Sequence, residues 1–373
     1  MAIYHFSGTI IARSQGRSSI AASAYRAGEK LVDEQLGLTY DYSKKQDVVH
    51  SEILLPDNAP ETLKDRQTLW NTVEKTEKRK DAQLAREFTI SLPRELTIEQ
   101  NKTLIVEFVQ SEFVDKGMIA DICLHNDLMP DGERQPHAHV MLTLREVSKE
   151  GFEQKVRQWN DKANLLAWRE AWANTANRHL ALQGFDKQID HRSYAEQGIE
   201  LEPQHKIGAS IAKDHMARLA DHQRIARENG NCLFENPDIA LDALTRQQST
   251  FTHQDLARFI NRHTETADQF KQVYDKVLAS PALVQLGLDN QGKQRLSTKE
   301  MLAIESSMLQ KAALLDSRLH HGVSEQTKAT VIRSRTLSQE QETALHYLTK
   351  AGDLKSLVGY AGTGKSYVLG ATK

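Results

Sequence analysis

The sequence predicts an α+β fold in which helices cover one face of an antiparallel sheet, followed by a mostly helical module. Stretches of aromatic and β-branched residues alternate with amphipathic periods in the order strand, helix, helix, strand, helix, strand, strand, helix. Two of these stretches, residues 118–125 and 137–144, flank the turn sequence Pro130-Asp131-Gly132. A short connection with such a turn predicts an antiparallel hairpin.

The chain opens with a predicted strand and a predicted helix. Aromatic and β-branched residues favour a strand at residues 3–11. An alanine-rich segment follows, with Ser18 or Ser19 as its N-cap, and predicts a helix that runs to Leu31.

The remaining elements of the α+β part follow from apolar periodicity and from turn residues. They are helices at residues 60–83, 98–114 and 162–182, and a strand at 86–92 that a proline ends. The polar stretch at residues 191–235 is expected to be extended surface chain with a short helix, and a domain boundary is placed there.

The last part of the chain predicts short helices, a small hairpin and a glycine-rich loop. The helices are expected at residues 240–247, 254–261 and 267–278, the hairpin at 286–292, and a further strand at 355–360. We therefore expect an α+β domain at 1–210, a linker at 211–235, a helical module that resembles a winged helix at 236–335, and the start of a P-loop domain at 336–373.

Composition excludes several classes of protein. The 373 residues include 48 Lys and Arg against 50 Asp and Glu, and no long apolar run or signal-peptide pattern is present. Membrane insertion and secretion are therefore not expected. The two cysteines lie far apart in sequence, which excludes a disulfide framework and fits a reducing cytoplasm. With a net charge of −2, any binding of nucleic acid must use a local groove.

Three histidines form the sharpest local pattern. His137 and His139 are two residues apart on a predicted strand, so both imidazoles point to one face of the sheet. The predicted hairpin brings His125 alongside them. Three neutral imidazoles suit a divalent metal and leave coordination positions open for water or a substrate oxygen. The competing interpretation is that two of these histidines are half-buried strand residues without a metal.

A tyrosine, three arginines and a carboxylate form the second pattern. Tyr25 lies in the middle of the alanine-rich helix, and a phenolate can attack phosphorus when its proton is removed and a metal polarises the phosphoryl oxygen. Glu87 lies on the strand at 86–92, where it could orient a metal-bound histidine or take the tyrosine proton. A packing tyrosine and a solvated glutamate are the commoner explanations. The arginines that could lie near a phosphodiester are Arg13, Arg17 and Arg26.

The third pattern is a glycine-rich phosphate loop near the end of the chain. Its residues for phosphate and magnesium are Gly359, Gly362, Gly364, Lys365 and Ser366. Backbone amides would hold the phosphates, with Lys365 on the β/γ oxygens. The chain ends at residue 373, which leaves no room for the parallel sheet of an ATPase. We therefore expect a cut-off ATPase domain without ATPase or helicase activity here, and ATP as a cofactor only of a full-length homologue.

Together these segments resemble the MobA/MobL (MobQ) family of conjugative relaxases, in particular its relaxase–helicase fusions of the Ti-plasmid TraA type. The resemblance covers residues 1–210 closely. It rests on the opening Met1-Ala2-Ile3-Tyr4-His5, on Gly16-Arg17-Ser18 with Ala24-Tyr25-Arg26-Ala27-Gly28, on Leu84-Ala85-Arg86-Glu87, on His125 with Pro136-His137-Ala138-His139, and on His191-Arg192-Ser193.

The resemblance implies a fold, a reaction and partners. The fold is that of HUH endonucleases, with a five-stranded antiparallel sheet. Tyr25 would attack one phosphodiester at the origin of transfer of single-stranded or supercoiled plasmid DNA and become joined to the 5′ phosphate. His125, His137 and His139 would hold Mg²⁺ or Mn²⁺, and Glu87 matches the acidic motif. Relaxosome accessory proteins and a type IV secretion coupling protein are the implied partners.

Three other functions compete with this interpretation. A rolling-circle replication or transposition initiator would use the same kind of site. A non-catalytic DNA-binding protein would use the histidines, with Cys123, as a structural zinc site. An ATP-driven motor would need ATP turnover by this chain, which we do not expect.

Overall fold

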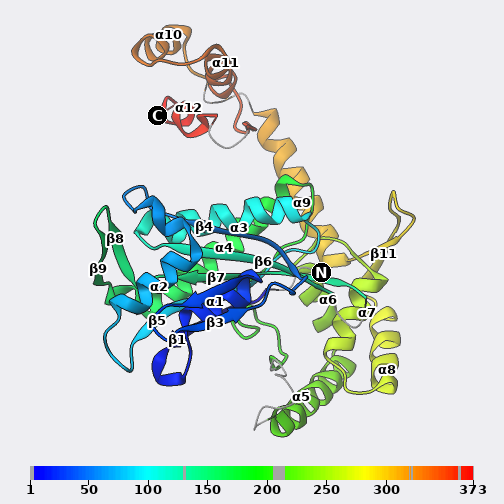
Figure 1. The fold of residues 1–373 in the computed structure, drawn as a ribbon. Helices are drawn as coiled ribbons and strands as arrows, with labels where there is room; N and C mark the ends of the chain where they lie inside the picture. The colour runs from blue at the N-terminus through cyan, green and yellow to red at the C-terminus, as the bar shows by residue number, and fades with distance from the viewer. Residues whose placement is uncertain are drawn as a thin grey trace. The chain divides into compact units, whose positions relative to one another are not determined.

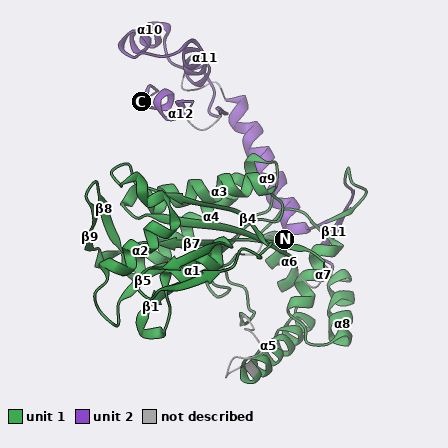
Figure 2. Ribbon diagram, in the orientation of Figure 1, with its two compact units in different colours: residues 1–280, 289–295 green, residues 281–288, 296–373 purple. Residues whose placement is uncertain are grey.

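The computed structural model describes residues 4–128, 132–204, 215–318, 320, 322–359 and 363–372. Figure 1 shows the course of the chain, and Figure 2 shows its two compact units. The first unit contains residues 1–280 and 289–295, and the second contains 281–288 and 296–373. The helix α5 (His215–Glu235) covers most of the expected linker at 211–235 and belongs to the first unit, so the two compact units divide later in the chain.

An antiparallel five-stranded sheet forms the centre of the first unit, with the strand order β1-β5-β7-β6-β4. Its strands are β1 (Phe6–Ala12), β4 (Val48–Leu54), β5 (Gln83–Ser91), β6 (Ala120–Leu128) and β7 (Arg134–Leu142). The α+β class, the five-stranded sheet and the hairpin of β6 and β7 are confirmed. Of the hairpin's expected turn, Pro130 and Asp131 lie outside the described residues.

Helices pack on both faces of the sheet, so the expectation that they cover one face is wrong. One core cluster joins the sheet to α3 (Ile98–Glu112) and α4 (Lys162–Leu182). A second joins the opposite face to α1 (Ser19–Ala27) and α2 (Arg66–Thr76). The two sets separate because neighbouring strand residues point to opposite faces, as Val140 in the first cluster and Met141 in the second illustrate.

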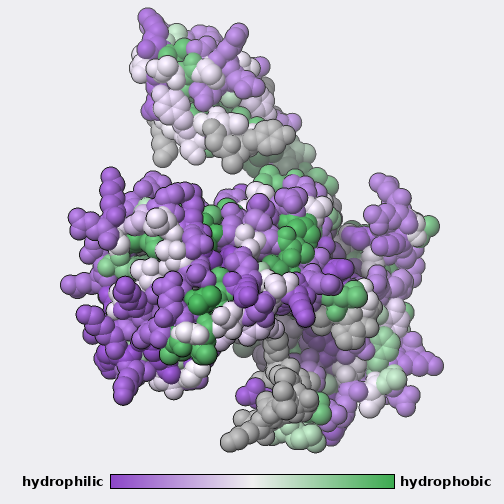
Figure 3. All heavy atoms as spheres, in the orientation of Figure 1, coloured by the Kyte–Doolittle hydropathy of each residue, from purple (hydrophilic) through white to green (hydrophobic). Residues whose placement is uncertain are grey.

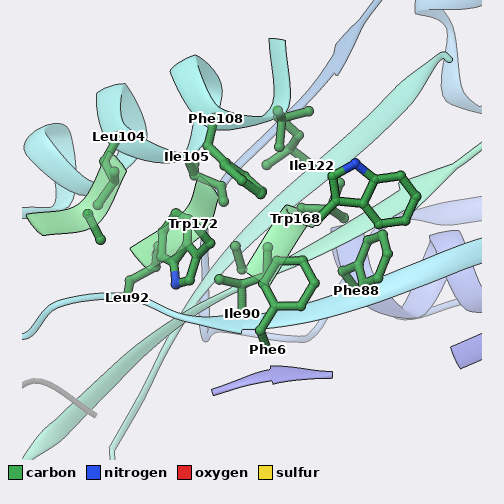
Figure 4. Packing of buried hydrophobic residues seen from close by; sticks show 14 of the residues in the cluster. Phe6, Phe88, Ile90, Leu92, Leu104, Ile105, Phe108, Ile122, Trp168 and Trp172 are labelled. Carbon is green, nitrogen blue, oxygen red and sulfur yellow. The ribbon is translucent and has the colours of Figure 1, made fainter. Parts of the chain in front are cut away.

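Aromatic rings fill the first of these cores (Figure 4). The ring of Phe88 lies 4.9 Å from that of Phe6, 5.5 Å from that of Phe113 and 5.5 Å from that of Trp168, centroid to centroid. Gly8 pairs with Phe88 across β1 and β5, and a Cβ at Gly8 would lie 2.7 Å from the Phe88 ring. Only glycine therefore fits this position without a shift of the core.

A buried carboxylate ties the two helices of the other face to β6. Asp121 accepts hydrogen bonds from Ser23 of α1 (2.8 Å) and from the indole N–H of Trp70 of α2 (2.8 Å). The Arg66 guanidinium donates to both oxygens of Asp121. Burial lowers the pKa of Arg66, but the pairing with Asp121 outweighs burial and raises that pKa. Because every partner is charged or hydrogen-bonded, the network fixes the position of α1 over the sheet.

Several expected elements end early or were missed. The first helix ends at Ala27 rather than Leu31, since Gly28 adopts a left-handed conformation (φ 66°) that closes it. The helix expected at 60–83 is limited to α2. Missed elements are β4 and the hairpins β2 (Lys30–Asp33) with β3 (Leu38–Asp41) and β8 (Arg145–Ser148) with β9 (Gly151–Lys155).

The C-terminal helices of the first unit agree with expectation except in the range 191–235. There the described residues include a 21-residue helix, α5 (His215–Glu235), in place of the short helix. The other elements are α6 (Asp238–Thr245), β10 (Phe251–Thr252), α7 (His253–Arg262) and α8 (Ala267–Leu278).

The second unit consists mainly of helices. Strands β11 (Leu283–Leu288) and β12 (Gln294–Thr298) lie side by side as the hairpin expectation requires, and α9 (Lys299–Ser317), α10 (Glu325–Ser334), α11 (Gln339–Leu348) and α12 (Lys365–Gly370) follow. The strand expected at 355–360 is absent from the described residues 355–359. The assignment of 336–373 to the start of a P-loop domain stays a prediction.

The surface carries no membrane-spanning element among the described helices: none is both long and apolar enough to cross a bilayer. Figure 3 shows hydrophilic side chains over most of the visible face, with apolar side chains in small separate patches.

Candidate active site

Three histidines lie together on the sheet face that α1 covers. His125 of β6 is directly opposite His137 of β7, and His139 follows two residues later on the same face. The three ring centroids are 4.8 to 5.1 Å apart, and possible ligand atoms of the three rings lie within 4.8 Å of one another. The structure therefore brings together the histidines that the sequence singled out.

Each imidazole is oriented by a hydrogen bond to an acceptor. His139 donates Nδ1–H to Glu87 (3.0 Å), and His137 donates Nδ1–H to the Gln135 carbonyl (3.2 Å). Both rings therefore keep a lone pair on Nε2. His125 donates Nε2–H to the Arg26 carbonyl (2.6 Å), which leaves its lone pair on Nδ1. Such partners fix tautomer and ring orientation in metal sites.

Two of these histidines, His125 and His139, are held in the neutral form that a metal requires. Burial lowers the pKa of His125, the hydrogen bond to the Arg26 carbonyl raises it, and the nearby Lys45 ammonium lowers it, so that the pKa lies at about 4. Burial also lowers the pKa of His139. Three imidazoles, each with a ring nitrogen free of its own proton, suit a divalent ion, so the donor set fits a metal.

Glu87 supports the cluster from the neighbouring strand β5. Besides His139, its carboxylate accepts from Arg26 Nε (2.5 Å) and lies 3.4 Å from Arg17 Nη2. Burial raises the pKa of Glu87, but the hydrogen bonds from His139 and Arg26 outweigh it and hold that pKa at about 2. A carboxylate this acidic binds protons too weakly to serve as a general base at neutral pH. Of the two roles considered for Glu87, the contacts favour orientation of His139.

Tyr25 projects from α1 into solvent beside this cluster. Its side chain is 43% exposed, although its neighbours on α1, Ala24 and Ala27, are buried. The ring of Tyr42 meets it edge to face at a centroid distance of 5.2 Å. The residue that follows it, Arg26, is the one whose carbonyl holds His125. The helix therefore places an accessible phenol next to the three histidines.

The structure adds Lys45, which the sequence analysis did not single out. Its Nζ lies 4.3 Å from the ring centroid of Tyr25 and 3.3 Å from Nδ1 of His125, to which it donates. It also lies 3.3 Å from Asp47. Lys45 belongs to the segment between β3 and β4, and no local motif marks it. Only the fold brings this segment to the site.

Asp47 and Asp127 form a second group of possible metal ligands with His125, whose ligand atoms also lie within 4.8 Å of one another. The Lys45 ammonium already neutralises Asp47 in this group. For His125 to bind a metal through Nδ1, Lys45 must give up its hydrogen bond to that atom.

The three arginines have different surroundings. Arg17 and Arg26 contact Glu87 at the site. Arg13 instead pairs with Glu74 (2.6 Å) and donates to backbone carbonyls that follow α2, including that of Glu77. Its guanidinium thus closes the end of α2. A role for Arg13 in DNA binding stays a prediction.

Cys123 does not complete the histidine cluster. It pairs with His139 across β6 and β7, but neither group of possible ligands found among the described residues includes it. Burial, and next the Asp121 carboxylate, raise the pKa of the Cys123 thiol. A cysteine binds zinc as its thiolate, so a thiol that resists deprotonation is a poor fourth ligand for the structural zinc interpretation.

The glycine-rich segment is only partly described, and its Gly362 lies outside the described residues. Lys365 begins α12 and donates from Nζ to the Gly359 carbonyl (2.5 Å), while Gly364 precedes the helix with φ 78°. Ser366 lies in the first turn of the same helix. Nucleotide binding at this segment stays a prediction.

An antiparallel five-stranded sheet with three histidines on its central strands, and a tyrosine on the helix that covers them, is the arrangement of the HUH relaxase fold. The comparison with known proteins agrees: the model of the MobA/MobL family matches residues 17–218. The chain belongs to the MobA/MobL family.

Relatives from bacteria are similar to this chain over different shares of its length. The "Conjugal transfer protein TraA" of Agrobacterium fabrum (strain C58 / ATCC 33970) is 33% identical over 423 aligned residues, which cover 100% of this chain and 38% of the relative. The "Mobilization protein MobL" of Acidithiobacillus ferridurans is 39% identical over 57% of this chain and 63% of its own length. The chain thus spans well under half the length of its TraA relative.

Two solved structures are also similar in part. A chain from "Molecular Basis of Vancomycin Resistance Transfer in Staphylococcus aureus" is 38% identical, with a TM-score of 0.48, over 52% of this chain and all of that one. The metal-bound "Conjugative Relaxase Trwc In Complex With Orit DNA" is 9% identical, with a TM-score of 0.34, over 74% of this chain and 99% of that one.

Proposed function

We propose that this chain is a conjugative relaxase that nicks one strand of plasmid DNA at the origin of transfer. The observation that carries the proposal is the exposed Tyr25 beside three oriented histidines that could hold a metal. A nucleophile and a metal-ligand cluster on adjoining elements are what tyrosine transesterification requires. Membership of a family whose relatives are named for conjugal transfer and mobilization supports conjugation over replication or transposition.

The reaction exchanges one phosphodiester for another. The Tyr25 oxygen forms a bond to phosphorus as the bond from phosphorus to the 3′ oxygen breaks. The proton that the phenol loses is balanced by the one that the leaving 3′ oxygen gains. Because the product is a 5′-phosphotyrosyl ester, the same step in reverse religates the strand without ATP.

The residues of the site divide this work between them. His125, His137 and His139 would hold Mg²⁺ or Mn²⁺, which when bound polarises the scissile phosphate. Glu87 keeps the ring of His139 in position, and Arg26 does the same for His125 through its carbonyl. Lys45 restrains the exposed Tyr25 ring through a cation–π contact.

The substrate and partners follow from the proposed reaction. Single-stranded or supercoiled DNA at the origin would be the substrate, within the bacterial cytoplasm. Relaxosome accessory proteins would expose the strand, and a type IV secretion coupling protein would receive the joined product. Of the three arginines, Arg17 and Arg26 lie at the site through their contacts with the Glu87 carboxylate, and they would be the arginines available to a phosphodiester.

A plasmid-nicking assay tests the proposal. Supercoiled plasmid that carries the chain's own origin of transfer is incubated with Mg²⁺ or Mn²⁺, and the relaxed form is measured after protease and detergent. Wild-type protein should relax the plasmid, and Tyr25→Phe should not. Nicking that persists in Tyr25→Phe would show that the tyrosine assignment is wrong.

A further inference from the structure

Two adjoining cavities lie in the first unit, next to the histidine cluster. Their volumes are about 400 and 270 Å³, and they share the lining residues Tyr4, Tyr194, Pro203 and Arg262. We refer to the two together as the Tyr4–Tyr194 pocket. Its size lies in the range of pockets that bind small ligands.

The larger cavity of the pocket is lined by two residues that contact His137, a candidate metal ligand. Ser91 and Gln135 line its larger cavity. Ser91 pairs with His137 across β5 and β7, and the Gln135 carbonyl accepts the hydrogen bond of the His137 ring. A strand of DNA whose phosphate reaches the histidines therefore has this pocket as its immediate neighbour.

Two segments singled out in the sequence meet in this pocket, although the proposed reaction uses neither. Tyr4 belongs to the opening segment, and Arg192 with Ser193 belongs to His191-Arg192-Ser193. About 190 residues separate these segments along the chain. Both segments therefore line the same pocket, and the reaction at Tyr25 does not explain why they do.

The hydroxyl ends of both tyrosines are anchored. His263 is 1% exposed and donates Nδ1–H to the Phe259 carbonyl (2.8 Å), so its Nε2 accepts from the Tyr194 hydroxyl (3.4 Å). The Tyr4 hydroxyl donates to the Arg169 carbonyl (3.5 Å). Rings held in this way lose little freedom when a base stacks on them, so the pocket is preorganised for stacking.

The charge of the pocket favours an anion. The described lining of the larger cavity includes Arg262, His5 and His222 and no carboxylate. Among the described residues, the Arg262 guanidinium forms no hydrogen bond or ion pair, whereas Arg192 is paired with Asp190. An aromatic wall with a cation at its side is the combination that binds a base and its phosphate.

We propose that the Tyr4–Tyr194 pocket binds one or two nucleotides of the DNA strand that flank the scissile phosphate. The base stacks on Tyr194, and the backbone phosphate lies against Arg262. This inference rests on the proposed function, because it takes single-stranded DNA as the substrate, but it assigns a binding site that the transesterification itself does not need.

Binding without cleavage tests the pocket. Fluorescein-labelled dT20 is titrated with the full chain in EDTA, and fluorescence anisotropy gives Kd. Stacking on one aromatic residue contributes about 1–3 kcal/mol, so Tyr194→Ala should weaken binding by about 5- to 150-fold. The matched variant Tyr194→Phe keeps the ring and should bind like the wild type. Arg262→Gln should remove one phosphate contact. The slope of log K for DNA binding against log salt concentration should then be smaller in magnitude by about 0.7.

Photo-crosslinking locates the DNA in the unaltered protein. When dT20 carries 5-iododeoxyuridine, the crosslinked peptides of the wild type should contain Tyr4 or Tyr194. Crosslinks that map only elsewhere would overturn the inference even if Tyr194→Ala fails to fold. Wild-type affinity in Tyr194→Ala, or equal competition by polyglutamate of matched length, would overturn it as well.

The outcomes separate this inference from the proposed function. If the Tyr25 adduct forms on origin DNA while crosslinks miss the pocket, only the pocket assignment fails. If crosslinks map to the pocket and no Tyr25 adduct forms, the pocket stands as a DNA site and the nicking function fails.

Discussion

The histidine cluster and the glycine-rich segment both carry motifs, but their surroundings differ. Each histidine of the cluster is held by an acceptor from another residue, and β5, β6, β7 and α1 all contribute to the site. In the glycine-rich segment, Lys365 bonds back to Gly359 of its own loop, and the described residues 355–359 form no strand. A motif predicts chemistry only where the fold supplies its supporting contacts.

Removal of the metal ligands should give the largest difference in cleavage rate between a variant of the histidine cluster and a variant of the glycine-rich segment. A bound metal supplies several kcal/mol of transition-state stabilisation, so His137→Ala with His139→Ala should lower the rate of oligonucleotide cleavage by about 100- to 10,000-fold. DNA binding in EDTA should change little. Lys365→Ala, in the other region, is the matched control and should cleave at the wild-type rate. If the histidine double variant still cleaves, the histidine cluster is not needed for cleavage and the contrast with the glycine-rich segment fails.

Loss of the Glu87 carboxylate should have the next largest effect. In Glu87→Gln the amide no longer neutralises Arg26 and Arg17 and holds His139 more weakly. Partners of metal ligands contribute about 10- to 100-fold in metal affinity, a loss that isothermal titration with Mn²⁺ would measure. Unchanged Mn²⁺ affinity would show that Glu87 supports the fold but not the metal site.

Acid should destabilise the metal-free protein through His125. Its pKa is about 4 in the fold, below the ordinary value of 6.5, so the unfolded state binds the proton more readily. The stability that the neutral ring contributes is complete above pH 6.5 and is lost as the pH falls toward 4, by roughly 2 kcal/mol. Urea unfolding in EDTA at pH 7 and pH 4.5 measures this loss.

The matched variant His125→Gln should show a smaller difference between the two pH values. Equal pH dependence in both proteins would contradict the buried, neutral state of His125. Lys365→Ala again serves as the control from the other region, and its pH dependence should match that of the wild type.

The smallest effect is expected from Lys45. A cation–π contact contributes about 0.5–2 kcal/mol, so Lys45→Met should lower kcat by about 3- to 30-fold and leave KM nearly unchanged. Lys45→Arg keeps a cation over the Tyr25 ring and should recover most of the rate. A change in KM alone would assign Lys45 to DNA binding rather than to positioning of Tyr25.

Much of the site was predictable because its histidines lie close together in the sequence, on two strands of one hairpin. His137 and His139 share a face through the two-residue period of a strand, and the hairpin brings His125 opposite. Tyr25 and Glu87 came from motifs, and their role in one reaction came from the resemblance to a family. The five-stranded sheet came from the same resemblance, and four of its strands also follow from residue type.

The missing parts depend on long-range contacts. Lys45 reaches Tyr25 only because β4, which was missed, pairs with β6 at the edge of the sheet. Alanine content extended the first helix to Leu31, but Gly28 ends it and lets Lys30–Asp33 pair as a strand. Arg13 was grouped with Arg17 by sequence proximity, whereas Glu74, 61 residues away, determines its place.

The measurement that tests the central claim most directly is the mass of the covalent product. The chain is incubated with a single-stranded oligonucleotide that covers its origin of transfer and Mn²⁺, then digested, and the DNA-linked peptide is sequenced by mass spectrometry. Our account predicts a 5′-phosphate ester on Tyr25 that is absent when EDTA is added. An ester on another residue, or one on Tyr25 that forms equally in EDTA, would contradict it.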